Sequence, residues 1–311
     1  MSNRRIIGID IAKHKADVYD LQRQKHQTIE AENYTEWVDA LAKDKPDIVV
    51  MEATGGYERI LAGFLGAAGI PLAIVNPRQV RDFAKAINQL AKNDKIDAQI
   101  IARFAEATKL EATPLVESAT QALQDLMARR RQLVAMRVAE SNREAQAIHP
   151  RVKKDITAML KFIEKQLAKL DDDLDHEIKN CPAWREAENL LTSVTGVGKI
   201  TARTLLSEMP ELGQANRGEI ACLAGLAPFD DDSGRYRGQR HIRGGRSQVR
   251  RVLYMACVSA VRSNPRIRSL YLRLRENGKS AKMALVACMR KMLLILNSIL
   301  KSKTPFVKKT T

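Results

Sequence analysis

The chain has 311 residues, of which 45% are hydrophobic and 28% charged, a composition typical of a globular protein with two or three domains. Its four cysteines are widely spaced and include no Cys-x-x-Cys pair, which argues against structural zinc and a disulfide framework. The formal net charge is +16, and the 79 residues from Ser233 onward hold 20 of the 52 Lys and Arg but only one of the 36 Asp and Glu.

This charge asymmetry gives the segment from Ser233 a net charge of +19, against −3 for the preceding 232 residues. It predicts a polyanionic partner, and nucleic acid is the natural one. The alternative is a basic surface that is merely solvated.

Neither a secretory signal nor a membrane span is expected. The N-terminal residues MSNRR lead directly into IIGIDIA, an apolar run too short for a secretory signal. The most apolar stretch, residues 283–300, carries Arg290 and Lys291 at its centre, which favours a buried or amphipathic helix. We therefore expect a cytoplasmic protein with no membrane partner.

The first hundred residues alternate between strand and helix patterns. Short apolar or alternating runs predict strands, and apolar residues at helical spacing predict helices. In chain order the predicted elements are strands at 5–12, 16–22 and 26–32, a helix at 34–44, a strand at 46–52, a helix at 55–69, a strand at 70–77 and further helices. Three strands, helix, strand, helix, strand, helix is the order of the ribonuclease-H-like fold, although many α/β domains share much of it.

The fold class is therefore α/β, followed by regions that are mainly α. Residues 1–112 form the predicted α/β domain. From 113 to 182, two long charge-rich helical patterns break at His149-Pro150 and predict an antiparallel, coiled-coil arm. Such an arm could join protomers, carry nucleic acid, or do both. Residues 183–311 read as a helical, basic domain.

A glycine pair interrupts the helical pattern of residues 190–209. Gly196 and Gly198 flank a valine, and Lys199 follows. This spacing matches the hairpin of a helix-hairpin-helix, in which glycines expose backbone N–H groups to a phosphate. A plain helix-turn-helix connection is an equal alternative, because a single Gly-Val-Gly is a weak motif.

Four acidic residues stand out from their surroundings. Asp10 lies within the first apolar strand, where a charge is costly unless it is used. Glu52 ends the predicted central strand, and strand carboxyl ends are where open α/β sheets place their sites. Asp94 and Asp97, three residues apart, face the same side of the helix that they begin. If that helix packs across the sheet, the four carboxylates converge.

The alternatives for these residues are structural. Asp10 could be an aspartate at a strand end that faces water. Asp94 and Asp97 could be ordinary helix-start residues, favoured by capping and by the helix dipole. Four converging carboxylates, however, could not all stay ionised without cations. Two Mg²⁺ ions suit oxygen-only ligands and could act on both the attacking and the leaving oxygen of a phosphodiester.

Six segments, in this order, carry a resemblance: GIDIAKHKADV, MEATGGYERILAGFLGAAGIPLAIVNPRQVRDFAKA, KNDKIDAQIIARFA, TGVGKITARTLL, CLAGLAPFDDDSG and GGRSQVRRVLYMACVSAVRSNP. Together they closely resemble the insertion-sequence one-ten transposase family, which includes the Piv-type DNA invertases and the bridge-RNA-guided recombinases. The resemblance covers nearly the whole chain. One small departure is Asn93, where the family pattern has a threonine before the last acidic pair.

The resemblance implies a RuvC-like (ribonuclease-H-like) DEDD domain, a coiled coil and a C-terminal transposase domain with an essential serine. On this basis Asp10, Glu52, Asp94 and Asp97 are the expected metal ligands and Ser233 the expected nucleophile. It also implies that a structured guide RNA from the element can choose the donor and target DNA. The arm and the need to hold two DNA partners suggest a homodimer or homotetramer in a prokaryotic cytoplasm.

Ser233 also has a plain interpretation, because Asp-Asp-Ser-Gly is a good turn sequence and predicts a surface loop. Its rival as nucleophile, Ser247, precedes a long helical pattern and is predicted to be an N-cap instead. A serine that attacks DNA would store the broken bond as a phosphoserine ester, so that strands could be rejoined without ATP.

Seven arginines and no acidic residue lie between Ser233 and Arg251. Guanidinium groups bind phosphate oxygens bidentately and would stabilise charge at a scissile phosphate. The alternative is a loop that binds the nucleic-acid backbone and takes no part in catalysis. The arginines are Arg235, Arg237, Arg240, Arg243, Arg246, Arg250 and Arg251.

Two rival functions remain from the sequence. A Holliday-junction-type nuclease would use the same carboxylates with water as nucleophile, and Ser233 would be only a turn residue. A non-catalytic DNA- or RNA-binding regulator would need the carboxylates for structure alone. The presence of three acidic companions for Asp10 disfavours the regulator.

Overall fold

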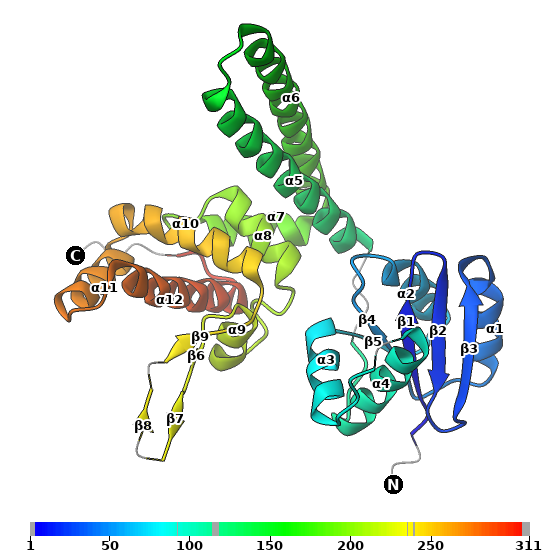
Figure 1. Cartoon of the computed structure of the whole chain (residues 1–311). Coiled ribbons are helices and arrows are strands. Elements are labelled where there is room, and N and C mark those ends of the chain that lie inside the picture. The colour runs from blue at the N-terminus through cyan, green and yellow to red at the C-terminus, as the bar shows by residue number, and fades with distance from the viewer. Residues whose placement is uncertain (1–3, 92, 114–117, 235, 239, 307–311) are drawn as a thin grey trace. The chain divides into compact units, whose positions relative to one another are not determined.

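The computed structural model describes residues 4–91, 93–113, 118–234, 236–238 and 240–306 (Figure 1). The chain divides into two compact units, an α/β unit at Met1–Val116 and a helical unit at Glu117–Thr311. The finer division into three domains, with boundaries at residues 112 and 182, stays a prediction.

The α/β unit is built on a five-stranded mixed sheet in the order β3-β2-β1-β4-β5 (Figure 1). The antiparallel pairs are β1 with β2 and β2 with β3, whereas β4 lies parallel to both β1 and β5. The strands are β1 (Ile6–Ile11), β2 (Lys15–Asp20), β3 (Lys25–Glu30), β4 (Ile48–Glu52) and β5 (Leu72–Val75).

Helices cover both faces of this sheet because alternate strand residues are apolar on each side. Ile7 and Ile9 of β1 belong to one buried cluster, which contains residues of α1 and α2. Ile6 belongs to the cluster on the opposite face, which contains residues of α3 and α4. The helices are η1 (Ala31–Asn33), α1 (Tyr34–Lys43), α2 (Glu58–Ala67), α3 (Pro77–Ala86) and α4 (Asp94–Ala107).

The predicted order of three strands, helix, strand, helix, strand, helix is confirmed for the α/β unit. The central position of β1, antiparallel to β2 and parallel to β4, is the arrangement of a ribonuclease-H-like sheet. The observed strands are a few residues shorter than the predicted ranges, because the flanking turn residues leave the ladder.

The helical unit begins with a long antiparallel hairpin formed by α5 (Ser118–Gln146) and α6 (Pro150–Asn180) (Figure 1). The break falls where it is predicted, since Pro150 is the first residue of α6. Leu133 of α5 packs with Ile163, Leu167 and Leu170 of α6. The two helices are also joined by an ion pair between Arg130 and Asp171, at 2.6 Å. Whether the hairpin supercoils as a coiled coil stays a prediction.

The remaining helices share one apolar core, which draws residues from six of them. Helix α12 is long and apolar enough to cross a membrane, but Cys288, Met292 and Leu296 on one of its faces are buried in this core. The helices are α7 (Pro182–Thr192), α8 (Lys199–Glu208), α9 (Arg217–Leu223), α10 (Ser247–Ser263), α11 (Pro265–Glu276) and α12 (Ala281–Ser302).

Candidate active site

Asp10 and Glu52 lie on the same face of the sheet. Asp10 is on β1 in alternation with Ile6 and Gly8, which face α4. Glu52 follows Val50 on the same side of β4 and ends that strand. The two acidic residues come directly after the last paired positions of the parallel β1–β4 ladder, so they are neighbours across it.

Helix α4 brings Asp94 and Asp97 to this face in its first turn. Asn93 is the N-cap, and its Oδ1 accepts a hydrogen bond from the N–H of Ile96 at 2.9 Å. The departure from the family pattern at Asn93 therefore keeps the capping function. The helix then crosses β1 at Gly8, which is closely approached by the backbone of α4.

The charges of these carboxylates are close enough to act on one another. Burial raises the pKa of Asp10 from its ordinary value of 3.8 to about 7. The next contributions to that rise come from neighbouring negative charges, in the order Asp97, Glu52, Asp94 and Asp17. A carboxyl group whose pKa is raised by burial and by neighbouring carboxylates is typical of sites that bind cations or exchange protons.

Asp17 and Lys15 belong to this group, although the sequence pattern did not single them out. Asp17 lies directly opposite Asp10 in the β1–β2 ladder, and its side chain is 5% exposed. It accepts hydrogen bonds from Thr28 Oγ1 at 2.7 Å and from Lys15 Nζ at 3.1 Å. Lys15 Nζ also donates to Asp94 Oδ2 at 2.8 Å and so links β2 to the start of α4. The signal that could have revealed them is the pairing register, which requires the hairpin turn to be placed correctly.

The loop that follows Glu52 is held by a buried carboxylate. Glu58, at the start of α2, accepts hydrogen bonds from the N–H groups of Thr54 at 3.1 Å and Gly56 at 2.9 Å. Burial by itself would raise the pKa of Glu58, but these backbone donors outweigh it and hold the pKa below the ordinary value. Glu58 therefore fixes the backbone directly after Glu52.

The donor set fits a hard divalent cation in its chemistry, because it offers only carboxylate oxygens. Among the described residues, however, no three His, Cys, Asp or Glu side chains surround one point as the ligands of a metal ion do. Asp94 is in contact with the ammonium group of Lys15.

Ser233 lies at the end of a narrow β-hairpin in the helical unit. The outgoing strands are β6 (Pro228–Phe229) and β7 (Asp232–Ser233), and the returning ones are β8 (Tyr236–Arg237) and β9 (His241–Ile242). Ser233 is exposed and pairs with Tyr236, and the following Gly234 is a turn residue with φ 55°. The plain prediction of a surface turn is thus confirmed for the backbone, and the role of Ser233 stays a prediction.

The base of this hairpin is fixed by a close crossing of glycines. A Cβ atom on Gly225 would lie 2.2 Å from the carbonyl oxygen of Gly244. One on Gly245 would lie 2.1 Å from the nitrogen of Gly225. The N–H of Arg246 donates to the carbonyl of Leu223 at 2.9 Å. The hairpin therefore leaves the helical core from a rigid base.

Several of the seven predicted phosphate-binding arginines have partners within the protein. Arg246 binds both carboxylate oxygens of Glu211 at 2.6 Å, and Arg250 donates to the carbonyl of Ala224 at 3.2 Å. Arg240 forms an ion pair with Asp230 at 2.5 Å, and both are exposed. Arg243 and Arg251 are exposed, whereas Arg235 and the side chain of Arg237 lie outside the described residues.

Arg246 is also the N-cap of α10, and Ser247 is the first residue of the helix. The predicted capping role of Ser247 is therefore wrong. The physical reason is that the contacts of Arg246 with Glu211 and Leu223 hold the chain extended up to that residue.

The Gly-Val-Gly segment lies between α7 and α8, and its two glycines have different surroundings: Gly196 is tightly packed and Gly198 is not. Gly196 has φ 101°, and a Cβ there would lie 2.6 Å from that of Ala260, so it allows α10 to pack closely. Gly198 is the N-cap of α8 and has open space around it. Lys199 is exposed and lies 3.6 Å from Asp175. Helix packing accounts for Gly196, and phosphate binding by Gly198 and Lys199 stays a prediction.

Two transposase family models match the chain. The first, a DEDD transposase model of the IS110 type, matches residues 7–149, which include all four predicted carboxylates. The second, described as the transposase IS116/IS110/IS902 family, matches residues 188–272, which include Ser233. Both matches are to transposase families.

Relatives match between three quarters and nearly all of the chain. The pilin gene-inverting protein of Moraxella bovis is 27% identical over 97% of this chain and 98% of its own. The transposase for insertion sequence element IS1111A of Coxiella burnetii is 27% identical over 75% of this chain and 71% of its own. A solved structure of T. thermophilus RuvC with a Holliday junction substrate aligns with 35% of this chain and 99% of its own, at a TM-score of 0.30 and 13% identity. The chain belongs to the IS110 family of transposases.

Proposed function

We propose that this chain is a DNA transposase that cuts, exchanges and rejoins strands in the prokaryotic cytoplasm, with Ser233 as nucleophile and the carboxylate face of the α/β unit as its metal site. The observation that carries the proposal is the group of acidic side chains around Asp10, whose mutual repulsion and burial raise the pKa of Asp10 to about 7. Such a concentration of like charges costs folding free energy.

Asp10, Glu52, Asp94 and Asp97 would hold Mg²⁺ once the cation replaces Lys15 beside Asp94. When bound, Mg²⁺ supplies Lewis-acid polarisation of a phosphate oxygen. The chain's own contribution is to hold four carboxylates on one sheet face and to keep their backbone rigid through Asn93 and Glu58.

The proposed covalent step conserves the phosphodiester bond energy. The Oγ of Ser233 forms a bond to the DNA phosphorus, the bond from phosphorus to one sugar oxygen breaks, and the departing oxygen takes up a proton. Attack by another strand's hydroxyl on the phosphoserine reverses these events and releases the serine. The exposed position of Ser233 at a hairpin end suits attack on a large substrate.

The proposal extends to partners. Donor and target DNA, and a structured guide RNA from the same element, would be bound by the segment from Ser233 onward, which carries 20 Lys and Arg against one acidic residue. The need to hold two DNA partners favours an assembly of several protomers, for which the α5–α6 hairpin offers a long surface, so the proposed assembly is a homodimer or homotetramer.

A denaturant-stable protein–DNA adduct is the expected product when the purified chain meets its element's DNA ends, the flanking transcript and Mg²⁺. The adduct, measured by denaturing electrophoresis, is expected to disappear in both Ser233→Ala and Asp10→Ala. Ser247→Ala is the matched control, a serine from the same region that should keep the adduct. Cleavage without adduct that survives Ser233→Ala but not Asp10→Ala would instead indicate a nuclease that uses water.

A further inference from the structure

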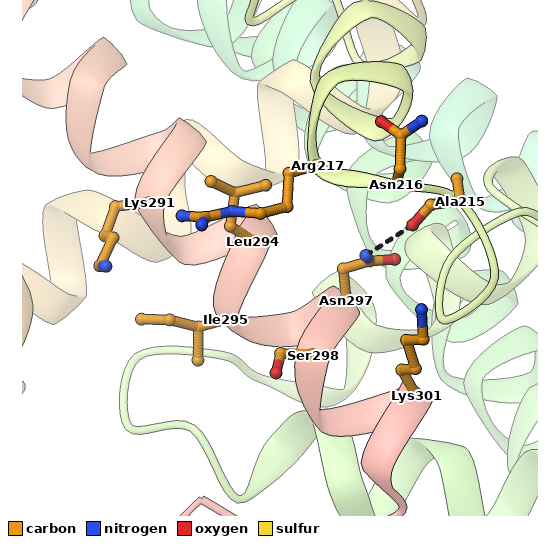
Figure 2. Close-up of a pocket in the computed structure, with 9 residues that line it drawn as sticks. All are labelled: Ala215, Asn216, Arg217, Lys291, Leu294, Ile295, Asn297, Ser298 and Lys301. Atoms are coloured by element: carbon orange, nitrogen blue, oxygen red, sulfur yellow. Dashed lines mark hydrogen bonds between the residues drawn. The ribbon is translucent and has the colours of Figure 1, made fainter.

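A basic pocket lies in the helical unit between the start of α9 and the outer side of α12 (Figure 2). Its volume is about 430 Å³, and Arg217, Lys291 and Lys301 line it. In Figure 2 the Arg217 side chain extends over Leu294, and the two lysines stand at opposite ends of the labelled group. None of the described residues that line the pocket is acidic.

The frame of this pocket is rigid. Asn297 of α12 is 6% exposed, and its Nδ2 donates to the carbonyl of Ala215 at 3.0 Å (Figure 2). Its Oδ1 accepts from the N–H of Gly213 at 2.7 Å. Asn216 then forms a capping box with Glu219. Both ends of the loop before Arg217 are therefore fixed, and its position beside α12 is set before any ligand binds.

The cations are spaced for an extended ligand. At 1.5 Å per residue, Lys291 and Lys301 lie about 15 Å apart along α12, with Leu294 and Ile295 between them. All three cations are exposed, and in the described part of the chain they form no ion pair. Three like charges around an apolar strip suit a chain of several phosphates with sugars between them, rather than one compact anion.

We propose that this pocket binds the phosphodiester backbone of a nucleic acid, at a site separate from the arginine-rich segment 235–251. The inference rests on the proposed function, since it takes the ligand to be the DNA or the RNA that the transposase handles. The backbone of either one supplies the same phosphates, so the two sources must be separated by experiment.

The test is fluorescence polarisation of the full chain with labelled duplex DNA and, in a second arm, labelled structured RNA, over a range of salt concentrations. The Lys291→Ala/Lys301→Ala double variant is expected to weaken binding about tenfold and to lower the salt slope by about 1 to 2. The matched control is Lys43→Ala/Lys45→Ala, two exposed lysines of the α/β unit, with the same change of charge.

A reduced slope with RNA alone assigns the pocket to RNA, and with duplex DNA alone to DNA, and both outcomes support the proposal. A salt slope equal to that of the control variant in both arms overturns it. Arg217→Ala gives an independent measurement on a second element. Because binding is measured without cleavage, loss of the adduct chemistry would refute the proposed function and leave this result standing.

A second, independent observation concerns the cation beside the carboxylates. Lys15 Nζ lies 2.8 Å from Asp94 Oδ2 and 3.1 Å from Asp17 Oδ2. Asp17 is held from its other side by Thr28, at 2.7 Å, so its carboxylate has a fixed direction. An ion pair with Lys15 alone would compensate the buried charge of Asp17, yet the ammonium group also contacts Asp94 on α4.

We infer that Lys15 is the chain's own counter-ion for this site and competes with a divalent cation for Asp94. The inference rests on the proposed metal site. Asp17 would position Lys15, and Lys15 would limit the repulsion among the carboxylates when they are not bound to metal. Binding of a divalent cation would then require Lys15 to leave Asp94.

Isothermal titration of the full chain with Mn²⁺, without nucleic acid, tests this competition. Lys15→Gln is expected to bind Mn²⁺ about threefold to tenfold more tightly than the wild type, because a competing positive charge is removed. Lys15→Arg should restore the wild-type affinity. Lys13→Gln, an exposed lysine two residues earlier, controls for the general loss of one positive charge.

Affinity that is unchanged or weaker in Lys15→Gln overturns the inference, as does an equal gain in Lys13→Gln. Absence of Mn²⁺ binding in every protein overturns both this inference and the proposed metal site. Binding that is the same in all variants overturns the inference alone.

Discussion

The Asp10→Asn variant is expected to melt at a higher temperature than the wild-type chain when a chelator removes divalent cations. Burial, followed by the charges of Asp97 and Glu52, raises the pKa of Asp10 from 3.8 to about 7, so an ionised Asp10 lowers the stability of the fold at neutral pH. The difference between these pKa values corresponds to a loss of at most about 4 kcal/mol in the free energy of unfolding. Because Asp10 is partly exposed to solvent, the expected loss is about 1–3 kcal/mol.

The pH dependence of this effect has a definite sign. A carboxyl group whose pKa is higher in the folded than in the unfolded chain binds its proton more tightly when folded, so stability falls as pH rises from 3.8 to about 7. Asparagine does not titrate. The advantage of the variant is therefore expected to be small near about pH 4 and full above about pH 7.

Thermal unfolding at several pH values in the presence of chelator checks this prediction. Asp39→Asn, an exposed acidic residue on α1, is the control and should show no such gain. A variant that melts below the wild type at neutral pH would show that Asp10 stabilises the fold, contrary to the argument. The same Asp10→Asn protein is expected to lose strand cleavage, so that stability and activity change in opposite directions.

Much of the α/β unit could be predicted from sequence because its strands and helices have clear periods. Asp10 and Glu52 could be singled out without knowledge of the register, because one is a charge within an apolar strand and the other ends the predicted central strand. Asp17 and Lys15 could not, because in an alternating strand they look like ordinary polar residues. Only the pairing of Asp17 with Asp10 shows that they face the same site.

The basic segment shows a different limit of sequence reasoning. The sequence gives no reason to distinguish among its seven arginines, but in the structure Arg246 is paired with Glu211, which is 35 residues away in sequence. Long-range ion pairs leave no local pattern in the sequence, so composition could not predict this pair. The phosphate-binding role of Arg246 stays a prediction. The rigid glycine crossing at Gly225 and Gly245 was hidden for the same reason, since each glycine alone reads as a turn.

Gly8→Ala is expected to disrupt the acidic face more than most single substitutions in the α/β unit. A Cβ atom on Gly8 would lie 2.3 Å from the carbonyl oxygen of Ala98 and 2.6 Å from the nitrogen of Ala102. Both are backbone atoms of α4, so no side-chain rotation can relieve the overlap, and the helix itself must move away from β1. Overpacking of this kind costs about 1–3 kcal/mol or more.

The displacement of α4 also has a functional consequence, because Asp94 and Asp97 begin this helix. Their carboxylates would move away from Asp10 and Glu52 on the sheet. The variant is therefore expected to bind Mn²⁺ at least about tenfold more weakly, since a shift of about 1 Å is large for a metal site. Thermal unfolding and isothermal titration on the same preparations measure the two effects.

Gly63→Ala is the matched control for this prediction. Gly63 lies within α2, where an added Cβ would meet nothing within 4 Å, so alanine there should be neutral or stabilising by about 0.5–1 kcal/mol. A Gly8→Ala protein that melts with the wild type and binds Mn²⁺ equally well would mean that α4 does not depend on close contact with β1. A Gly8→Ala protein that is as stable as the wild type but binds Mn²⁺ more weakly would show that α4 moved as a rigid body. Metal binding would then depend on the position of the carboxylates and not on the stability of the fold.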